Sequence, residues 1–276
     1  MLRPKGLENY IYRTLKFRKD FNMRKLNSLV AKTALATLLM ASLVFLADLN
    51  KIAYAEDEPE LINLPGSFSG SFGIFTDYKF RGITQTDEEM AVQGNFDWSH
   101  EKGYYFGVWG SNVDFGAKGQ GNTEFDIYAG VAREYYGITF DIGGIWYTYP
   151  GATDNLNLDF FEYKFGMSYE FPLIAVGTSI NYTPQNTAGS EDATYVSFDA
   201  EVPLVSRLVM SGHVGHQWIT DETAFGKPDY VDWSIGAGYS THGFDLSVAY
   251  VDTDLNSTEC SEDCDGQVIF GISRSF

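Results

Sequence analysis

The sequence predicts an all-β fold, namely a transmembrane antiparallel up-and-down β-barrel of about twelve strands in a bacterial outer membrane. Three observations predict it. From Ser67 to the C-terminus, apolar and polar residues alternate with a period of two, which is the period of a strand with two different faces. The connections between these segments are alternately short and long. The N-terminal residues have the pattern of an export signal.

Residues 1–55 are predicted to be a leader and signal peptide that is cleaved after Ala55. An uncharged, mostly apolar run of fifteen residues, 33–47, follows Arg24 and Lys25 and precedes a small-residue site at 53–55. This order is that of a secretory signal, and Met23 is an alternative start. A retained membrane anchor is the other interpretation, although a spanning helix needs roughly 20 apolar residues.

The chain after Ala55 is strongly acidic. It holds nine Lys and Arg against 34 Asp and Glu, a charge that repels phosphates and excludes nucleic acid as a partner. Residues 56–66 are expected to form a short periplasmic segment, and residues 67–276 the barrel. Because export leads to an oxidising compartment, Cys260 and Cys264 are expected to form a disulfide. Two free thiols are the alternative.

The first alternating segment shows the barrel pattern best. Phe68 and Phe72 fall on one face, and Asp77 and Lys79 on the other. One face suits lipid and the other suits water, as in the strands of membrane barrels. The twelve predicted strands are 67–81, 91–100, 104–114, 124–136, 138–149, 158–170, 173–182, 193–202, 208–218, 230–240, 244–252 and 267–276.

Details of these strands give further expectations. Aromatic residues occupy both faces of 104–114, so the orientation of that strand stays open. The pair Gly143-Gly144 predicts a bend or bulge. The short connections are 100–103, 136–137, 170–172, 203–207 and 241–243, and the long polar ones are 82–90, 115–123, 150–157, 183–192, 219–229 and 253–266. Since short turns are periplasmic in such barrels, both termini are expected there.

A soluble sandwich also alternates, but three features favour a membrane barrel. Strands of about ten residues match a tilted crossing of a bilayer. The chain ends on Phe276, which follows Phe270 on one face and resembles the assembly signal read by the barrel assembly machinery. Aromatic residues near strand ends suit the interfacial girdles of a membrane; they are Trp98, Tyr104, Trp218, Trp233 and Tyr250.

Several motifs resemble a known family. Residues 76–87, Thr-Asp-Tyr-Lys-Phe-Arg-Gly-Ile-Thr-Gln-Thr-Asp, are similar to the opening segment of the TorF family of porin-like proteins, a proteobacterial family of conserved hypothetical proteins. The resemblance extends over about 70–276. It implies an outer-membrane barrel with a channel role and no catalytic residues. The further similar segments are 108–116, 228–236, 249–255, 273–276 and the paired cysteines Cys260 and Cys264.

The inward face is rich in charge. Nine acidic and three basic residues are predicted to line the pore: Asp77, Lys79, Arg81, Asp97, Glu124, Asp126, Glu134, Asp141, Glu162, Lys164, Asp199 and Glu201. Carboxylates in an open lumen favour cations. The predicted function is therefore a porin-like channel that prefers cations and allows passive diffusion of small hydrophilic solutes or ions. The alternative is an interior filled by hydrogen-bonded side chains, as in a non-conducting structural or adhesive barrel.

An enzyme is the less favoured hypothesis. Ser211 and His213 share a face, but that face is predicted to point inward, whereas an outer-membrane lipid hydrolase needs its residues on the outer wall. His213 and His216 are three residues apart on a strand and therefore point to opposite sides. The acidic segment around Cys260 lacks the spacing of a calcium loop. Neither a metal site nor a cofactor is expected, the expected partners are membrane lipid and small solutes, and the oligomeric state stays open.

Overall fold

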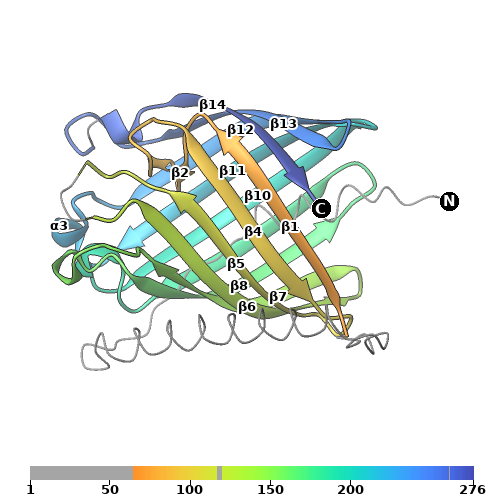
Figure 1. The fold of residues 1–276 in the computed structure, drawn as a ribbon, viewed down its shortest axis with the longest axis horizontal. Coiled ribbons are helices and arrows are strands. Elements are labelled where there is room, and N and C mark those ends of the chain that lie inside the picture. Colours follow the sequence, from red (N-terminus) through yellow and green to blue (C-terminus); the bar gives the residue numbers. More distant parts are fainter. Residues whose placement is uncertain (1–64, 117–119, 261) are drawn as a thin grey trace, which may run out of the picture. The chain divides into compact units, whose positions relative to one another are not determined.

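Twelve long strands close into a ring. The computed structural model describes residues 65–116, 120–260 and 262–276. Each strand of the ring pairs antiparallel with its sequence neighbour, and β1 pairs with β14 to close the barrel (Figure 1). The predicted fold class, a twelve-stranded antiparallel barrel, is confirmed. The predicted signal peptide, its cleavage site and most of the segment 56–66 lie outside the described residues.

The barrel strands lie close to the segments predicted from alternation. They are β1 (Ser67–Phe75), β4 (Ala91–Ser99), β5 (Tyr104–Asn112), β6 (Thr123–Tyr135), β7 (Ile138–Thr148), β8 (Phe160–Glu170), β9 (Ala175–Thr183), β10 (Ala193–Val205), β11 (Leu208–Ile219), β12 (Tyr230–Thr241), β13 (Phe244–Thr253) and β14 (Gln267–Ser275). The short elements are β2 (Lys79–Phe80), β3 (Ile83–Thr84), η1 (Asp154–Leu156), η2 (Thr187–Gly189), α3 (Glu222–Phe225) and η3 (Glu262–Cys264). No helix among the described residues has the length and hydropathy needed to cross a membrane.

The barrel has two different ends. The short turns and the first and last strand residues lie at one end, here called the turn end, and the long connections lie at the other, called the loop end. Figure 1 shows α3 and β2 together at the loop end. The alternation of short and long connections in the sequence therefore has a direct structural counterpart.

The first strand is shorter than predicted, which corrects the range 67–81. The strand β1 ends at Phe75, and residues 76–90 form a loop that contains the two-stranded hairpin β2–β3. Arg81 and Gly82 both have positive φ, 49° and 79°, as the two central residues of a type I′ turn require. Alternation continues through this stretch because β2 is itself a strand, although it leaves the barrel wall.

Two further expectations about strand irregularity are wrong. Gly143-Gly144 makes no bulge, because β7 pairs with β6 and β8 in unbroken register there. The register shift occurs in β10 between Pro203 and Val205, so this strand continues past the proline that was predicted to lie in a connection. Pro203 is tolerated because it lies at the end of the strand and at the bulge, where no ladder hydrogen bond depends on its nitrogen.

The two faces of the barrel differ as predicted. The outward side chains are large and apolar, and many are about half exposed; Phe72 and Phe96, for example, each expose 52% of their surface. The inward side chains are mostly polar and include the buried carboxylates of Glu124 and Glu162. For β5, whose orientation the sequence left open, Tyr104 and Phe106 are exposed and point outward, whereas the inward Ser111 is buried.

Candidate functional site

The interior of the loop end is crossed by residues 76–90, called the inward loop from here on. Its tip residue, Arg81, contacts Glu162 of β8, with Nη2 2.9 Å from Oε2. The Arg81 guanidinium also donates to Gln217 of β11 and lies 3.9 Å from the centre of the Tyr195 ring of β10. In the ring of strands, β8, β10 and β11 lie on the far side from β1. The inward loop therefore spans the lumen.

Internal hydrogen bonds give the inward loop its shape. The buried Asp77 carboxylate accepts from the hydroxyls of Thr84 and Thr86, at 2.6 Å and 2.7 Å. The Gln85 N–H donates to the Tyr78 carbonyl at 2.7 Å. These bonds run across the two arms of the hairpin, so the carboxylate of Asp77 serves the fold of the loop rather than facing an open pore.

The base of the hairpin is tied to the last long connection. The Lys79 ammonium donates to the backbone carbonyl oxygens of Asp263 and Asp265, at 3.4 Å and 2.9 Å. Burial lowers the pKa of Lys79 below its usual value, because desolvation disfavours the charged form. The connection that receives this lysine contains a disulfide between Cys260 and Cys264, whose Cα atoms are 5.9 Å apart.

One side of the mouth is filled by an aromatic cluster. Tyr78 of the inward loop packs edge-on against Trp109 of β5, with ring centres 5.3 Å apart, and its hydroxyl lies 3.5 Å from Glu124. Phe80 lies 6.2 Å from the ring of Tyr147. The buried members of the cluster are Val113, Tyr128, Ile145, Tyr147, Tyr149 and Phe160. Sequence reasoning did not find this packed region, because inward aromatic residues are rare in a fully hydrated lumen.

A second buried ion pair lies deeper in the wall. The Lys164 Nζ is 2.8 Å from Asp141 Oδ2, and Tyr105 donates its hydroxyl to the other oxygen of the same carboxylate at 2.8 Å. Asn181 donates to Glu162 at 3.3 Å. Basic side chains of the interior thus contact carboxylates, which compensates for the cost of burying them.

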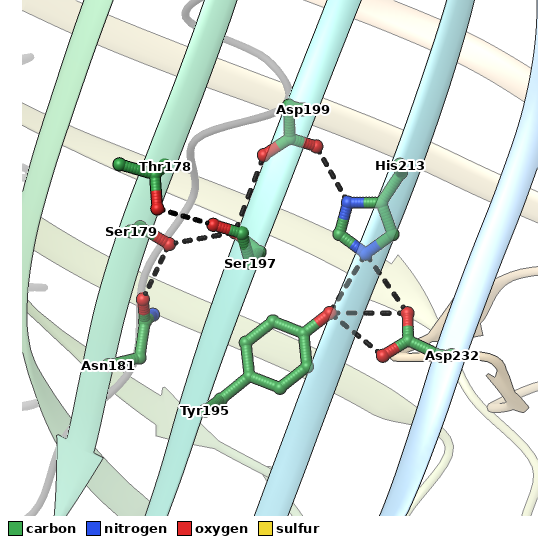
Figure 2. A network of polar contacts seen from close by, with 8 residues as sticks. All are labelled: Thr178, Ser179, Asn181, Tyr195, Ser197, Asp199, His213 and Asp232. Atoms are coloured by element: carbon green, nitrogen blue, oxygen red, sulfur yellow. Dashed lines mark hydrogen bonds and ion pairs between the residues drawn. The ribbon is translucent and has the colours of Figure 1, made fainter.

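A histidine joins two carboxylates in the wall formed by β10, β11 and β12. Figure 2 shows His213 between Asp199 and Asp232, with ring nitrogens 2.6 Å and 3.0 Å from their oxygens. Tyr195 donates to Asp232 at 2.9 Å, and its hydroxyl lies 2.9 Å from His213. Since Tyr195 also carries the Arg81 guanidinium on its ring, this network supports the tip of the inward loop.

Two inward tyrosines, Tyr105 and Tyr195, reach over inward glycines of nearby strands. A Cβ built at Gly215 would overlap the Tyr195 hydroxyl, and one at Gly130 or Gly143 would overlap that of Tyr105. Each tyrosine can therefore lie along the wall and reach a carboxylate on the next strands. This packing explains the Gly143-Gly144 pair, whose first member makes room for a ring instead of forming a bulge.

The opposite part of the wall is small and polar. Many inward positions of β11 to β14 and β1 carry serine or glycine, and several of these residues keep part of their surface accessible. The residues in question are Ser71, Ser211, Ser234, Gly236, Ser247, Gly271 and Ser275. A closely packed core would bury such positions. The ring of Phe75 lies against Gly73 and Gly271, so the accessible part of this wall is formed mainly by its serines.

The structure separates the predicted pore residues into groups. Eleven of them lie in the barrel interior or in the inward loop, with their side chains buried or half-buried, and Lys79 is one of the residues of the inward loop. Glu134 is exposed next to the turn end and belongs to neither network. Asp97 accepts from the Tyr128 hydroxyl. The sequence prediction missed His213, Asp232, Gln217 and Tyr195, although the alternation of β10 to β12 already placed them on the inward face.

The histidines and the acidic connection hold no assembled metal site in the described part of the chain, where no group of three or more His, Cys, Asp or Glu side chains is poised around a common point. His216 points outward and stacks on Trp218, with ring centres 4.0 Å apart. His213 and Ser211 point inward, away from the outer wall.

Comparisons with curated proteins and solved structures give likenesses in structure alone. No curated protein matches the chain in sequence. The KdgM porin is similar in structure with a TM-score of 0.50 and 5% identity, over 75% of this chain and 98% of that chain. The NanC porin gives 0.49 and 11%, over 76% and 99%, and an outer membrane channel from Pseudomonas putida F1 gives 0.46 and 9%, over 80% and 100%.

A family model covers the whole of the described barrel. It matches residues 62–276 and carries the description of a bacterial protein of unknown function, Gcw_chp. The match includes the inward loop, the charged wall and the disulfide-bonded connection. The chain belongs to the Gcw_chp family of bacterial proteins.

Proposed function

We propose that this protein is a porin-like channel of the bacterial outer membrane, which lets small hydrophilic solutes or ions diffuse passively and prefers cations. The observation that carries the proposal is the contrast between its two faces. Large apolar side chains cover the outside, whereas the inside is lined by serine, glycine and charged side chains apart from the aromatic cluster on one side of the mouth. A water-soluble barrel would hide its apolar side chains inside, whereas a membrane barrel turns them toward lipid.

The partly accessible serine wall of β11 to β14 supports a hydrated interior. Hydroxyl groups and backbone surface at Ser211, Ser234 and Ser247 can replace part of the hydration shell of a small polar solute. Structural likeness to the KdgM porin supports the same architecture. The name TorF, which the motif at 76–87 suggested, belongs to this proposal as well.

Cation preference follows from the charges of the wall. Acidic residues outnumber basic ones, and Arg81, Lys164 and His213 each contact a carboxylate. The potential inside the lumen is therefore negative, which attracts cations and repels anions.

Export and assembly belong to the same proposal. The segment 1–55 acts as the cleaved signal, and the terminal Phe276, which is exposed, is the residue that the barrel assembly machinery reads. Hydrolysis of lipid is disfavoured, because Ser211 and His213 face the lumen while lipid lies outside.

A non-conducting structural barrel is the second candidate, and one observation favours it. The inward loop contacts both sides of the mouth, since Tyr78 packs on Trp109 while Arg81 reaches Glu162. If this arrangement never opens, the barrel transports nothing.

Planar-bilayer recording with the purified, refolded barrel separates the two candidates. The channel proposal expects ion current and, in a salt gradient, a reversal potential of the sign given by cation selectivity. Absence of current in wild type and in a variant with residues 79–84 replaced by a short Gly-Ser linker would favour the structural barrel. Anion selectivity would refute the charge argument alone.

A further inference from the structure

The inward loop is built differently from the other long connections. Its tip lies inside the ring of strands, where Gly82 packs on β12 and β13: a Cβ at Gly82 would lie 2.9 Å from the Asp232 Cβ and would overlap the Thr253 methyl group. Tyr78 lies against β5 and Arg81 against β8, β10 and β11. One short hairpin therefore touches most of the circumference of the mouth.

The inward loop is nevertheless separable from the barrel ladder. Its two short strands pair only with each other among the described strands, and the barrel closes behind it through the pairing of β1 with β4 and β14. Movement of the loop would break none of these ladder bonds. Outside the ladders, two backbone bonds tie the loop to the barrel: the Thr76 N–H donates to the Phe270 carbonyl at 2.9 Å, and the Asp114 N–H donates to the Gln85 carbonyl at 2.8 Å. The tip, residues 79–84, lies between these two points, so the barrel can keep its structure while the tip leaves the mouth.

Side-chain contacts of two kinds hold the tip. Arg81 forms a charge-assisted pair with Glu162 and a cation–π contact with Tyr195, and both its side chain and that of Glu162 are nearly buried, at 7% and 1% exposure. Lys79 binds backbone carbonyl oxygens of the disulfide-bonded connection. A buried pair is costly to break on one side only, because the remaining charge stays without its partner.

From this geometry we infer that residues 76–90 are the gate of the lumen and that Arg81 is the residue that holds the gate shut. The closed state has the Arg81–Glu162 pair across the lumen. The open state requires the pair to separate and the hairpin to swing out of the mouth. The inference rests on the proposed channel function and names the element that controls it.

The gate predicts how single substitutions change conduction. Arg81→Ala removes the pair, the stacking on Tyr195 and the bond to Gln217, so open time or mean conductance should rise by roughly twofold or more. Glu162→Gln keeps the shape of the side chain but removes its charge, and should raise conduction in the same direction. Both substitutions remove the same Arg81–Glu162 pair. The double variant should therefore conduct no more than Arg81→Ala alone.

Arg207→Ala is the matched control, because Arg207 is an exposed arginine in the turn after β10 and the substitution makes the same change in charge. It should leave conduction unchanged. Reversible unfolding of each variant shows whether the barrel itself is intact, since the gate lies outside the ladder and its loss should leave barrel strands paired.

Planar-bilayer and liposome-swelling measurements on wild type and the five variants, namely the two single variants, the double variant, the Arg207→Ala control and the linker variant, test the gate. Increased current in Arg81→Ala and Glu162→Gln, with the control unchanged, supports the gate. If wild type conducts steadily and the Arg81→Ala and linker variants conduct equally, the gate is refuted while the channel remains. If neither wild type nor the linker variant conducts, the proposed function fails and the gate fails with it.

Discussion

Replacement of Gly215 by alanine tests the packing of the lumen wall. At this position a Cβ would overlap the hydroxyl and Cζ of Tyr195 and would lie 2.6 Å from its Cε2. The ring must therefore move, and it then loses its bonds to Asp232 and His213, both at 2.9 Å. Alanine itself suits a strand at least as well as glycine, so any loss of stability comes from the displaced ring.

The expected loss is about 3 kcal/mol. Overpacking of a closely packed site costs about 1–3 kcal/mol, and a hydrogen bond to a charged group contributes about 1.5–3 kcal/mol. Partial relaxation of the ring keeps the total below the sum. Gly212→Ala is the matched control, because Gly212 lies on the outer face of the same strand and the nearest atom to its built Cβ is 4.0 Å away.

The assay is urea unfolding of the refolded barrel in lipid vesicles, followed by the fluorescence of its five tryptophans. Gly212→Ala should change the free energy of unfolding by less than about 0.5 kcal/mol. In a Tyr195→Ala background, Gly215→Ala should cost almost nothing, because the overlapping ring is gone. Equal stability of Gly215→Ala and Gly212→Ala would refute the tyrosine-over-glycine packing.

Three further predictions concern charge and cross-linking. Lys164→Met removes the ammonium group 2.8 Å from Asp141 and should lower the free energy of unfolding by about 3 kcal/mol in the same assay. Adding Asp141→Leu should recover most of that loss. A double variant whose loss equals the sum of the two single losses would contradict the prediction. Replacement of Cys260 and Cys264 by serine should cost at most about 2 kcal/mol and speed proteolysis within residues 254–266, whereas unchanged cleavage would show that the disulfide does not order the connection. Burial raises the pKa of Asp159 above its usual value of 3.8, so the folded chain binds this proton more tightly than the unfolded chain does, and the stability falls as the pH rises through the raised pKa. Asp159→Asn should therefore be as stable as wild type near pH 3 and more stable at pH 7. A difference in unfolding free energy that is the same at both pH values would contradict this prediction.

Alternation predicted the barrel well, because a two-residue period is a direct consequence of strand geometry. It could not tell a wall strand from the hairpin β2–β3, since both alternate. The turn residues Arg81 and Gly82, with positive φ, carried the missing signal: a residue pair ending in glycine, flanked by short apolar-polar strands, is typical of a type I′ turn.

The sequence predicted which polar residues line the inside of the barrel, but not which of them pair with one another. Glu162 and Lys164 were placed on the inward face from their spacing in one strand. Their actual partners, Arg81 and Asp141, come from distant segments, and pairing across a lumen depends on the register and size of the closed ring. Local sequence does not contain that information. Tyr195 was overlooked for a related reason, since a large aromatic ring fits the lumen only where a neighbouring strand supplies a glycine such as Gly215.

The central claim is that water fills the interior of this barrel while lipid surrounds it, and thiol labelling along β13 tests it most directly. Both native cysteines are in the disulfide, so a single new cysteine reports alone. In the barrel folded into vesicles, Ser247→Cys, which faces inward, should react with a small membrane-impermeant thiol reagent, and Val248→Cys, which faces outward, should not. Labelling of Val248→Cys together with protection of Ser247→Cys would contradict the account.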